Sequence, residues 1–163
     1  MKKIILFELL FTILIVAIIG ALLYRKPVKD VPLTEVKAAF ENEADFGEME
    51  DWGDMTLRRN FALDAADYRE YLYYGQPDTM SVQVFLLVKC ASEEETDQVL
   101  KAIDVYLERE RKAFEGYGES QTALLKDARI YQKGAYVGLI VAKDADAWEK
   151  RLKTLLEDQD GIF

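Results

Sequence analysis

The chain has 163 residues, half of them hydrophobic, and a formal net charge of −9, with no histidine and one cysteine, Cys90. The missing histidine removes the usual general base and the commonest metal ligand, and a single cysteine can form neither an internal disulfide nor a zinc site of the cysteine and histidine type. Four basic residues and one acidic residue lie in the first 26 positions, so the remainder holds 17 basic and 29 acidic side chains, a net charge of −12. Such an acidic chain repels phosphate groups, which argues against nucleic acid as a partner.

The N-terminus has the composition of a membrane anchor. Residues 4–24 are 21 consecutive positions with one charged side chain, Glu8. As a helix this stretch is about 31 Å long, enough to cross the core of a bilayer. A cleaved signal peptide needs small residues before the cut, where Ile18 and Ile19 stand instead, and a lipoprotein signal needs a cysteine. We therefore predict that residues 1–26 are an uncleaved, single-pass transmembrane signal anchor that contacts the lipid bilayer through residues 4–24.

The rest of the chain divides into a short tether and one domain. Residues 27–33 include Pro27 and Pro32 and predict the tether, and residues 34–163 predict a soluble α+β domain. A short basic N-terminus ahead of the first apolar run usually stays in the cytoplasm. We therefore expect a protein of the cell membrane whose soluble domain lies outside the cytoplasm.

The first half of the domain contains one helix and one hairpin. Residues 34–45 have the apolar spacing of a helix that begins at Thr34. Residues 45–55 are acidic and interrupted by glycine, which predicts a loop or a short edge strand. A helical turn capped by Asp64 follows, and alternating apolar residues then predict a β-hairpin over residues 68–90.

The second half repeats this order. A long helix is predicted over residues 91–118, where Ser92 and Glu95 form a capping box. The sequence then predicts a short helix over residues 120–128, a hairpin over residues 129–143 and a closing helix over residues 144–158.

An internal repeat suggests how these elements assemble. Residues 85–103 align without gaps on residues 138–156, and each copy contains a strand, a capped start and an amphipathic helix. We therefore predict an α+β fold in which two β-β-α units form a four-stranded, mainly antiparallel sheet. Both long helices would pack on one face of the sheet, and a single transmembrane helix would precede the domain.

The stretch FEGYGESQTALL, residues 114–125, has the glycine content of a phosphate-binding loop. A P-loop follows a strand and ends in lysine with serine or threonine, whereas a helix precedes these glycines. Glu115 and Glu119 would also repel phosphate. We therefore predict a corner between two helices.

The longer stretch FEGYGESQTALLKDARIYQKGAYVGLIVA, residues 114–142, resembles the centre of a bacterial family, domain of unknown function 4358. Residues 57–75, LRRNFALDAADYREYLYYG, resemble the segment before the first hairpin of that family, and the similarity extends over about residues 33–157. Many members resemble secreted lipoproteins, so the resemblance implies an envelope location, although this chain lacks the lipobox cysteine. The resemblance implies no activity and no catalytic residues.

Acidic side chains are concentrated after the first predicted helix. They are Glu41, Glu43, Asp45, Glu48, Glu50, Asp51 and Asp54. The cluster lacks the alternating ligand spacing and the central glycine of a calcium loop, which favours a solvated acidic surface over a calcium site. The sequence predicts no catalytic residue, no cofactor and no metal site.

One face of the predicted sheet would be partly aromatic if both long helices covered the other. The candidate interaction surface on that face comprises Tyr71, Tyr73, Phe85, Leu87, Tyr136 and Ile140. The alternative is that the helix at residues 34–45 covers this face with Val36 and Phe40, and the cost of leaving apolar surface in water favours it.

These observations predict a membrane-anchored extracytoplasmic domain, acting as a non-catalytic binding or interaction module of the bacterial cell envelope. Its partner would be another envelope protein. The first alternative is a carboxylate-dependent hydrolase, with Asp64 and Asp67 as candidates, although a helix start already explains these residues. The second alternative is a purely structural envelope subunit.

Overall fold

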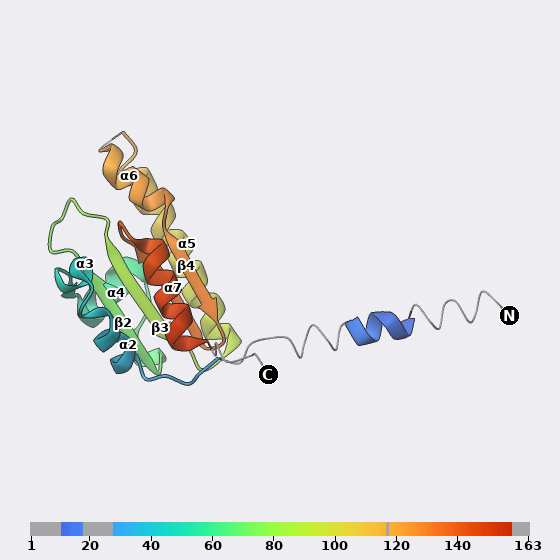
Figure 1. The fold of residues 1–163 in the computed structure, drawn as a ribbon. Coiled ribbons are helices and arrows are strands. Elements are labelled where there is room, and N and C mark those ends of the chain that lie inside the picture. The colour runs from blue at the N-terminus through green and yellow to red at the C-terminus, as the bar shows by residue number, and fades with distance from the viewer. Residues whose placement is uncertain (1–10, 18–27, 117, 158–163) are drawn as a thin grey trace.

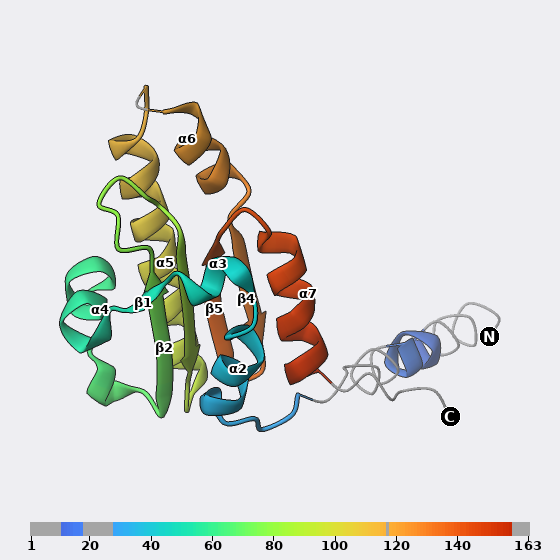
Figure 2. The same ribbon diagram turned by 60° about the vertical axis from the view of Figure 1, so that its left-hand side comes forward.

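The computed structural model describes residues 11–17, 28–116 and 118–157 of the chain. In this part a five-stranded antiparallel sheet lies between two layers of helices (Figure 1, Figure 2). The strands, in their order across the sheet, are β1 (Glu50–Asp51), β2 (Glu70–Gly75), β3 (Val84–Lys89), β5 (Tyr136–Val141) and β4 (Arg129–Lys133). The helices are α2 (Leu33–Phe40), α3 (Ala44–Gly47), α4 (Gly53–Phe61), the 3-10 helix η1 (Ala65–Asp67), α5 (Glu93–Ala113), α6 (Glu119–Lys126) and α7 (Ala145–Leu156).

Both predicted hairpins are present and form the sheet. Strand β2 pairs antiparallel with β3, with Glu70 opposite Lys89, and β4 pairs antiparallel with β5, with Lys133 opposite Tyr136. The two hairpins join through an antiparallel β3–β5 pair at the centre of the sheet. The α+β class and the antiparallel pairing predicted from the sequence are therefore confirmed.

The predicted number of four strands is wrong, because residues 45–55 contain the short edge strand that is one of the two predicted alternatives, and this strand, β1, adds a fifth. Strand β1 pairs with the end of β2, with Glu50 opposite Gly75. Trp52 directly follows β1, and its ring packs over Gly75. A Cβ atom added at Gly75 would lie only 2.5 Å from the Trp52 ring. The same ring meets Tyr73 edge to face, with centroids 5.4 Å apart. A partly buried aromatic ring thus holds a short acidic strand that has no apolar alternation of its own.

The predicted transmembrane helix is also not found. No helix in the described ranges is long and apolar enough to cross a bilayer, which contradicts this part of the predicted architecture. Residues 11–17 are helical, and the other positions of the predicted span, residues 4–24, lie outside the described residues.

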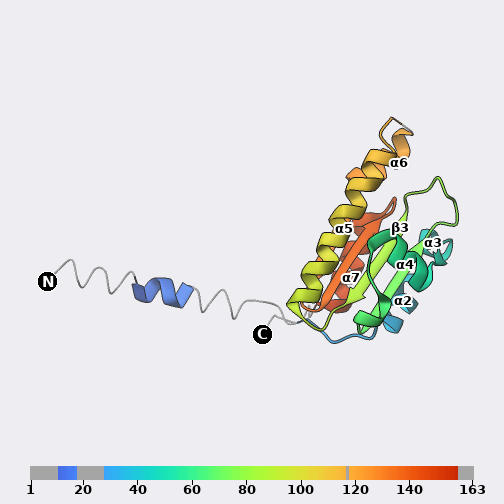
Figure 3. The same ribbon diagram turned by 180° about the vertical axis from the view of Figure 1, so that it is seen from behind.

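The two long helices lie on opposite faces of the sheet, contrary to the prediction that they share one. Helix α7 covers one face in Figure 1, and α5 covers the other in the view from behind (Figure 3). Strand β3 explains the arrangement, because all six of its residues are buried. Val84 and Leu86 face α5, whereas Phe85 and Leu87 face α7. Since both faces are apolar, a single helix layer would leave half of the strand in water.

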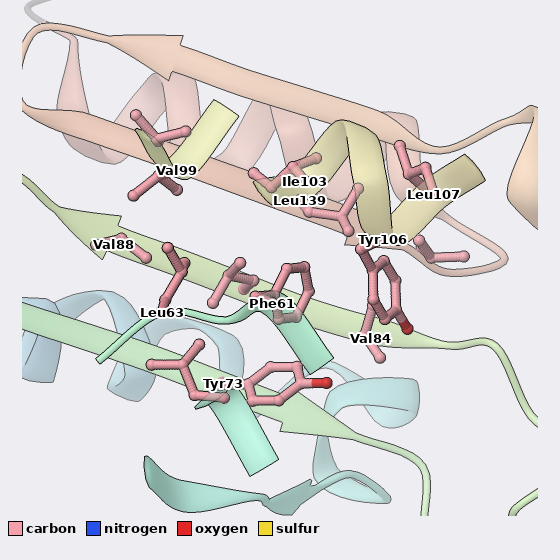
Figure 4. Close-up of a cluster of buried hydrophobic side chains, with 14 of the residues drawn as sticks. Phe61, Leu63, Tyr73, Val84, Val88, Val99, Ile103, Tyr106, Leu107 and Leu139 are labelled. Atoms are coloured by element: carbon pink, nitrogen blue, oxygen red, sulfur yellow. The ribbon is translucent and has the colours of Figure 1, made fainter. Parts of the chain in front are cut away.

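Each layer has its own core. On the α5 side, Phe61 of α4 stacks on Tyr106 with centroids 4.4 Å apart and meets Tyr73 edge to face at 5.3 Å (Figure 4). On the α7 side, Phe40 of α2 packs on Phe85 with centroids 4.9 Å apart, and Trp148 of α7 meets Phe40 at 5.6 Å. These rings attach α4 and α2 to opposite faces of the same hairpin.

The glycine-containing stretch at residues 114–125 forms a corner between α5 and α6, as predicted. Gly116 and Gly118 have φ angles of 78° and 90°, which non-glycine residues rarely adopt. The hydroxyl of Thr122 donates to the carbonyls of Phe114 and Gly118, at 3.2 and 3.3 Å. These bonds connect the end of α5 to the first turns of α6.

The close approach of β3 and β5 at Gly138 gives a first prediction. A Cβ atom at Gly138 would lie 2.8 Å from the carbonyl oxygen of Leu86, so a Gly138→Ala variant must move a strand backbone. We expect it to lower the free energy of unfolding by about 1–3 kcal/mol, measured by urea denaturation of the full chain.

Gly47→Ala is the matched control for this variant. A Cβ atom at Gly47 would lie 3.8 Å from the carbonyl oxygen of Glu41, an ordinary contact. We expect a change within about 0.5 kcal/mol. Equal unfolding midpoints for the two variants would contradict the close approach.

Candidate functional site

Five of the six side chains predicted to form an interaction surface are buried. Tyr73, Phe85, Leu87, Tyr136 and Ile140 are each 1% exposed or less. Val36 and Phe40 of α2 belong to the same cluster as Phe85, Leu87 and Ile140, so the alternative with a covering helix is the arrangement present. Tyr71 and Tyr73 belong instead to the cluster on the α5 side, so the six residues do not share one face of the sheet as predicted. The five buried side chains form no exposed face, because leaving them in water would forfeit the burial that holds α2 and α4 to the sheet.

Tyr71 is the exception, since it is half-exposed on the outer edge of β2. The direction of its backbone groups follows from the hydrogen-bond pattern of the hairpin. The N–H of Gln76 donates to the carbonyl of Gln83 at 3.2 Å, so even-numbered residues of β2 bond to β3. The N–H and C=O of Tyr71 therefore point away from β3, toward the edge of the sheet.

Strand β1 occupies only the far end of this edge. It pairs with Tyr74 and Gly75, and the N–H of Trp52 donates to the carbonyl of Tyr73 at 3.0 Å. The chain then turns into α4, whose first residues stand beside Tyr71. Beyond β1, the edge of β2 therefore stays open between α4 and α2 (Figure 2).

A groove of about 490 Å³ lies along this open edge. We call it the β2-edge groove. Its walls come from the start of α2, the start of α4, η1 and β2 itself. The lining residues are Leu33, Thr34, Asp54, Ala65, Ala66, Tyr68, Arg69, Glu70, Tyr71 and Leu72. It brings open backbone groups, two tyrosines and several charges together from segments distant in the sequence.

A larger depression of about 540 Å³ lies at the α5–α6 corner. Its lining includes Gly116, Gly118 and Glu119, together with Lys126. The carboxylate of Glu119 stands at the start of α6, where a phosphate would have to bind, so the depression offers a poor anion site. We therefore place the candidate site in the β2-edge groove.

The tyrosine hydroxyls of the groove are protonated donors. Burial raises the pKa of Tyr71, and the hydrogen bond from its hydroxyl to Asp54 together with the charges of Asp54 and Asp51 raises it further. Burial also raises the pKa of Tyr68 to about 12, with added contributions from Cys90, Asp67 and other acidic groups. Near neutral pH both side chains can donate hydrogen bonds, and neither acts as a base.

A buried lysine, Lys89, pairs with Glu70 of the groove lining. The ammonium of Lys89 lies 3.1 Å from a carboxylate oxygen of Glu70 and 2.8 Å from one of Asp30, and its side chain is 7% exposed. Burial lowers the pKa of Lys89, but hydrogen bonds to Asp30 and Glu70 outweigh it and hold the pKa above its ordinary value. The other oxygen of Glu70 accepts from the N–H of Leu33 at 2.8 Å. Glu70, and not the predicted cap Thr34, therefore satisfies the start of α2.

Residues 28–33, which the sequence assigns to a tether, are bound to the domain, and we call them the N-terminal strap. The hydroxyl of Tyr136 accepts from the N–H of Val31 at 2.7 Å and donates to its carbonyl at 2.8 Å. The N–H of Lys29 donates to the carbonyl of Leu156 at 2.9 Å. The strap therefore connects the start of the domain to the end of α7.

The predicted hydrolase residues do not converge on a pair of free carboxylates. Asp64 accepts from the N–H of Ala66 at 3.2 Å and forms an ion pair with Arg58. This is the capping role that its position predicted. Asp67 lies at the end of η1 and is exposed. Asp64 and Asp67 both line a hollow of about 320 Å³ beside α5, which Lys101 also lines, but Asp64 is already held there by Arg58 and the N–H of Ala66.

The structure also shows the surroundings of the acidic cluster and of Cys90. Within the described ranges no group of three or more histidine, cysteine or acidic side chains is arranged to hold a metal ion. Glu41, Glu48 and Asp54 of the cluster are exposed. Burial raises the pKa of the Cys90 thiol, which is 1% exposed, so this side chain packs as a small apolar group.

Sequence reasoning missed the network of Glu70, Lys89 and Tyr136. A usable signal was present: a lysine ends the otherwise apolar strand β3, and the hairpin register places Glu70 opposite it. A buried lysine needs a carboxylate partner. No sequence pattern predicts the position of the strap, because Val31 and Tyr136, which hold it to the domain, are 105 residues apart in the sequence.

A Tyr136→Phe variant tests the attachment of the strap. It removes one oxygen atom and both hydrogen bonds to Val31. We expect the full chain to lose about 1–3 kcal/mol of unfolding free energy in urea. We also expect the Val31 amide to exchange with solvent at least about tenfold faster, measured by hydrogen exchange.

Tyr106→Phe is the matched control, since Tyr106 is a buried tyrosine in the layer on the other side of the sheet. This control should leave the exchange of Val31 unchanged. An unchanged Val31 amide in Tyr136→Phe would contradict the attachment.

Comparison with known proteins gives a single kind of match. No match is found among curated proteins or among solved structures. A family model described as domain of unknown function (DUF4358) matches residues 42–142, well over half of the chain. The matched region includes both hairpins, α5 and most of the β2-edge groove, and it confirms the resemblance seen in the sequence. The chain belongs to the DUF4358 family.

Proposed function

We propose that this chain is a non-catalytic binding or interaction module and that the β2-edge groove is its contact surface. The observation that carries the proposal is the open backbone of Tyr71 at the base of the groove. A strand edge with unpaired N–H and C=O groups is a template for pairing with another chain. Because α2, η1 and α4 flank the edge, an incoming segment would meet walls as well as a strand.

The side chains of the groove support recognition more than turnover. Tyr68 and Tyr71 supply protonated hydroxyls, and the carboxylate of Asp54 accepts a hydrogen bond from Tyr71. Such groups orient a bound segment by hydrogen bonds. A carboxylate-dependent hydrolase would need two carboxyl groups of different pKa in one cleft, and this alternative stays a prediction.

We also propose that the module works in the cell envelope, with its domain outside the cytoplasm and residues 4–24 associated with the lipid bilayer. The apolar composition of residues 4–24 supports this proposal, since they contain one charged side chain. The partner in this setting would be another envelope protein.

Photo-crosslinking in cells tests the contact surface. A photo-reactive amino acid replaces Arg69, which is exposed on the groove wall. We expect a discrete protein adduct after irradiation, because a side chain at this position reaches a bound segment. Gln132, exposed on the opposite edge strand β4, is the control position and should give no such adduct. Equal adducts from both positions, or none from position 69, would count against the proposal.

Alkaline carbonate extraction of cell membranes tests the association with lipid. We expect the full chain to stay in the membrane pellet, because carbonate releases proteins that are held by charge, whereas the apolar side chains of residues 4–24 would be held by burial in lipid. The matched variant carries lysine in place of Leu14 and Val16, and it should move to the soluble fraction. Release of the unmodified chain by carbonate would contradict the association.

A further inference from the structure

The open edge of β2 has room for one more strand. Strand β1 pairs with Tyr74 and Gly75 and then leaves the edge at Trp52. Past this point Tyr71 presents an outward N–H and C=O, and the β2-edge groove runs beside them. An extended segment placed in the groove would continue the line of β1 and form a backbone pair with Tyr71.

The other edge of the sheet is better protected. The N–H of Cys90 donates to the carbonyl of Ala135, which sets the pattern of the second hairpin and turns Ile130 and Gln132 of β4 outward. Basic residues stand at both ends of β4 and form ion pairs, Arg129 with Asp146 of α7 at 2.6 Å and Lys133 with Glu157, just after α7, at 3.8 Å. Basic residues along an edge discourage pairing with another strand. The two edges therefore differ in accessibility although both are open.

The charges around the groove select the kind of segment that can enter. Asp54 lines the groove, and Asp51 and Asp67 contribute negative potential at its two tyrosines. Arg69 opposes them within the lining, Arg58 and Arg59 share a neighbouring hollow with Asp54, and the ammonium of Lys89 is divided between Glu70 and Asp30. The part of the chain after residue 26 has a net charge of −12, and the field of this acidic domain attracts cationic segments to the groove and repels acidic ones.

The same charges disfavour the acidic domain of a second copy of this chain as the occupant. The part of the chain after residue 26 has a net charge of −12, and the groove of a second copy would be equally acidic. Juxtaposed like charges cost free energy in an interface. The occupant is therefore a segment of a different protein.

We propose that the β2-edge groove binds an extended segment of a partner protein that carries lysine or arginine, and that this segment adds to the sheet as a strand beside Tyr71. This inference rests on the proposed function as an interaction module and specifies the chemistry of its partner. The backbone pair with Tyr71 fixes the direction of the segment. Its basic side chains lie beside Asp54, the carboxylate on the groove wall.

Peptide binding to the purified full chain tests the inference. The probe is a short peptide of alternating lysine and valine, blocked at both ends, and its matched control has glutamate in place of lysine. We expect the lysine peptide to bind, with an affinity that falls as salt is added, and to slow the exchange of the Tyr71 amide. We expect the glutamate peptide to bind at least about tenfold more weakly.

Two pairs of variants locate the binding. Tyr71→Pro removes the outward N–H without removing a bond to β3, and Ile130→Pro makes the equivalent change on β4. We expect Tyr71→Pro to weaken binding of the lysine peptide at least about tenfold and Ile130→Pro to leave it unchanged. Asp54→Asn should weaken binding about threefold to tenfold, whereas Asp104→Asn on the exposed face of α5 should have no effect.

Binding of the lysine peptide that is equal in Tyr71→Pro and the unmodified chain would overturn the inference. The inference would also be overturned if the lysine peptide slowed the exchange of the β4 amides and not that of Tyr71. It would be overturned as well if the peptide did not bind to a chain whose unfolding free energy is normal. If the crosslink from position 69 still forms in cells while these peptide results are negative, the interaction module stands and the strand addition fails. If neither the crosslink nor the binding of the lysine peptide is seen, the interaction module and the strand addition both fail.

Discussion

The burial of β3 and β5 on both faces is the constraint on which the rest of the structure depends. Every residue of these two strands is buried, although antiparallel sheets commonly leave one face in water. A buried aliphatic or phenylalanine side chain contributes about 1.5–3 kcal/mol, so exposing either face would cost more than the net stability of a typical domain. Two helix layers are therefore required, and α5 and α7 supply one each. With both faces closed, a partner can reach the sheet only at its edges.

The polar network of Glu70, Lys89 and Tyr136, at one end of the sheet, fixes the position of the N-terminal strap. Lys89 ends β3 and Tyr136 begins β5, so both groups lie on the two most buried strands. Their ammonium and hydroxyl hold Val31 and Asp30 of the strap, while Glu70 holds the start of α2. An ion network of this kind gains little free energy after desolvation, but it specifies one position for the segment it binds. The strap therefore enters the domain in a defined direction.

The same network shapes the β2-edge groove. Glu70 is drawn toward Lys89, which removes its charge from the groove and leaves Asp54 with Tyr71 at the opposite wall. The arrangement combines an unpaired strand edge with an acidic rim. Strand edges supply affinity through backbone hydrogen bonds that any sequence can make, whereas charges select among sequences. A module built this way would recognise a class of segment, defined by extension and positive charge, and would need no deep pocket.

The sequence by itself determined the local elements of this protein. Alternating apolar residues on either side of Lys133–Gly134 predicted the second hairpin, and Ser92 with the stripe behind it predicted α5, because these signals arise between near neighbours in the chain. Only the tertiary structure decided the fifth strand, the separation of α5 and α7, and the candidate site. A two-residue acidic strand has no period to detect, and an amphipathic helix has the same pattern whichever face of a sheet it covers. The groove and the strap depend on contacts such as Trp52 with Tyr73 and Val31 with Tyr136, which exist only after distant segments have packed.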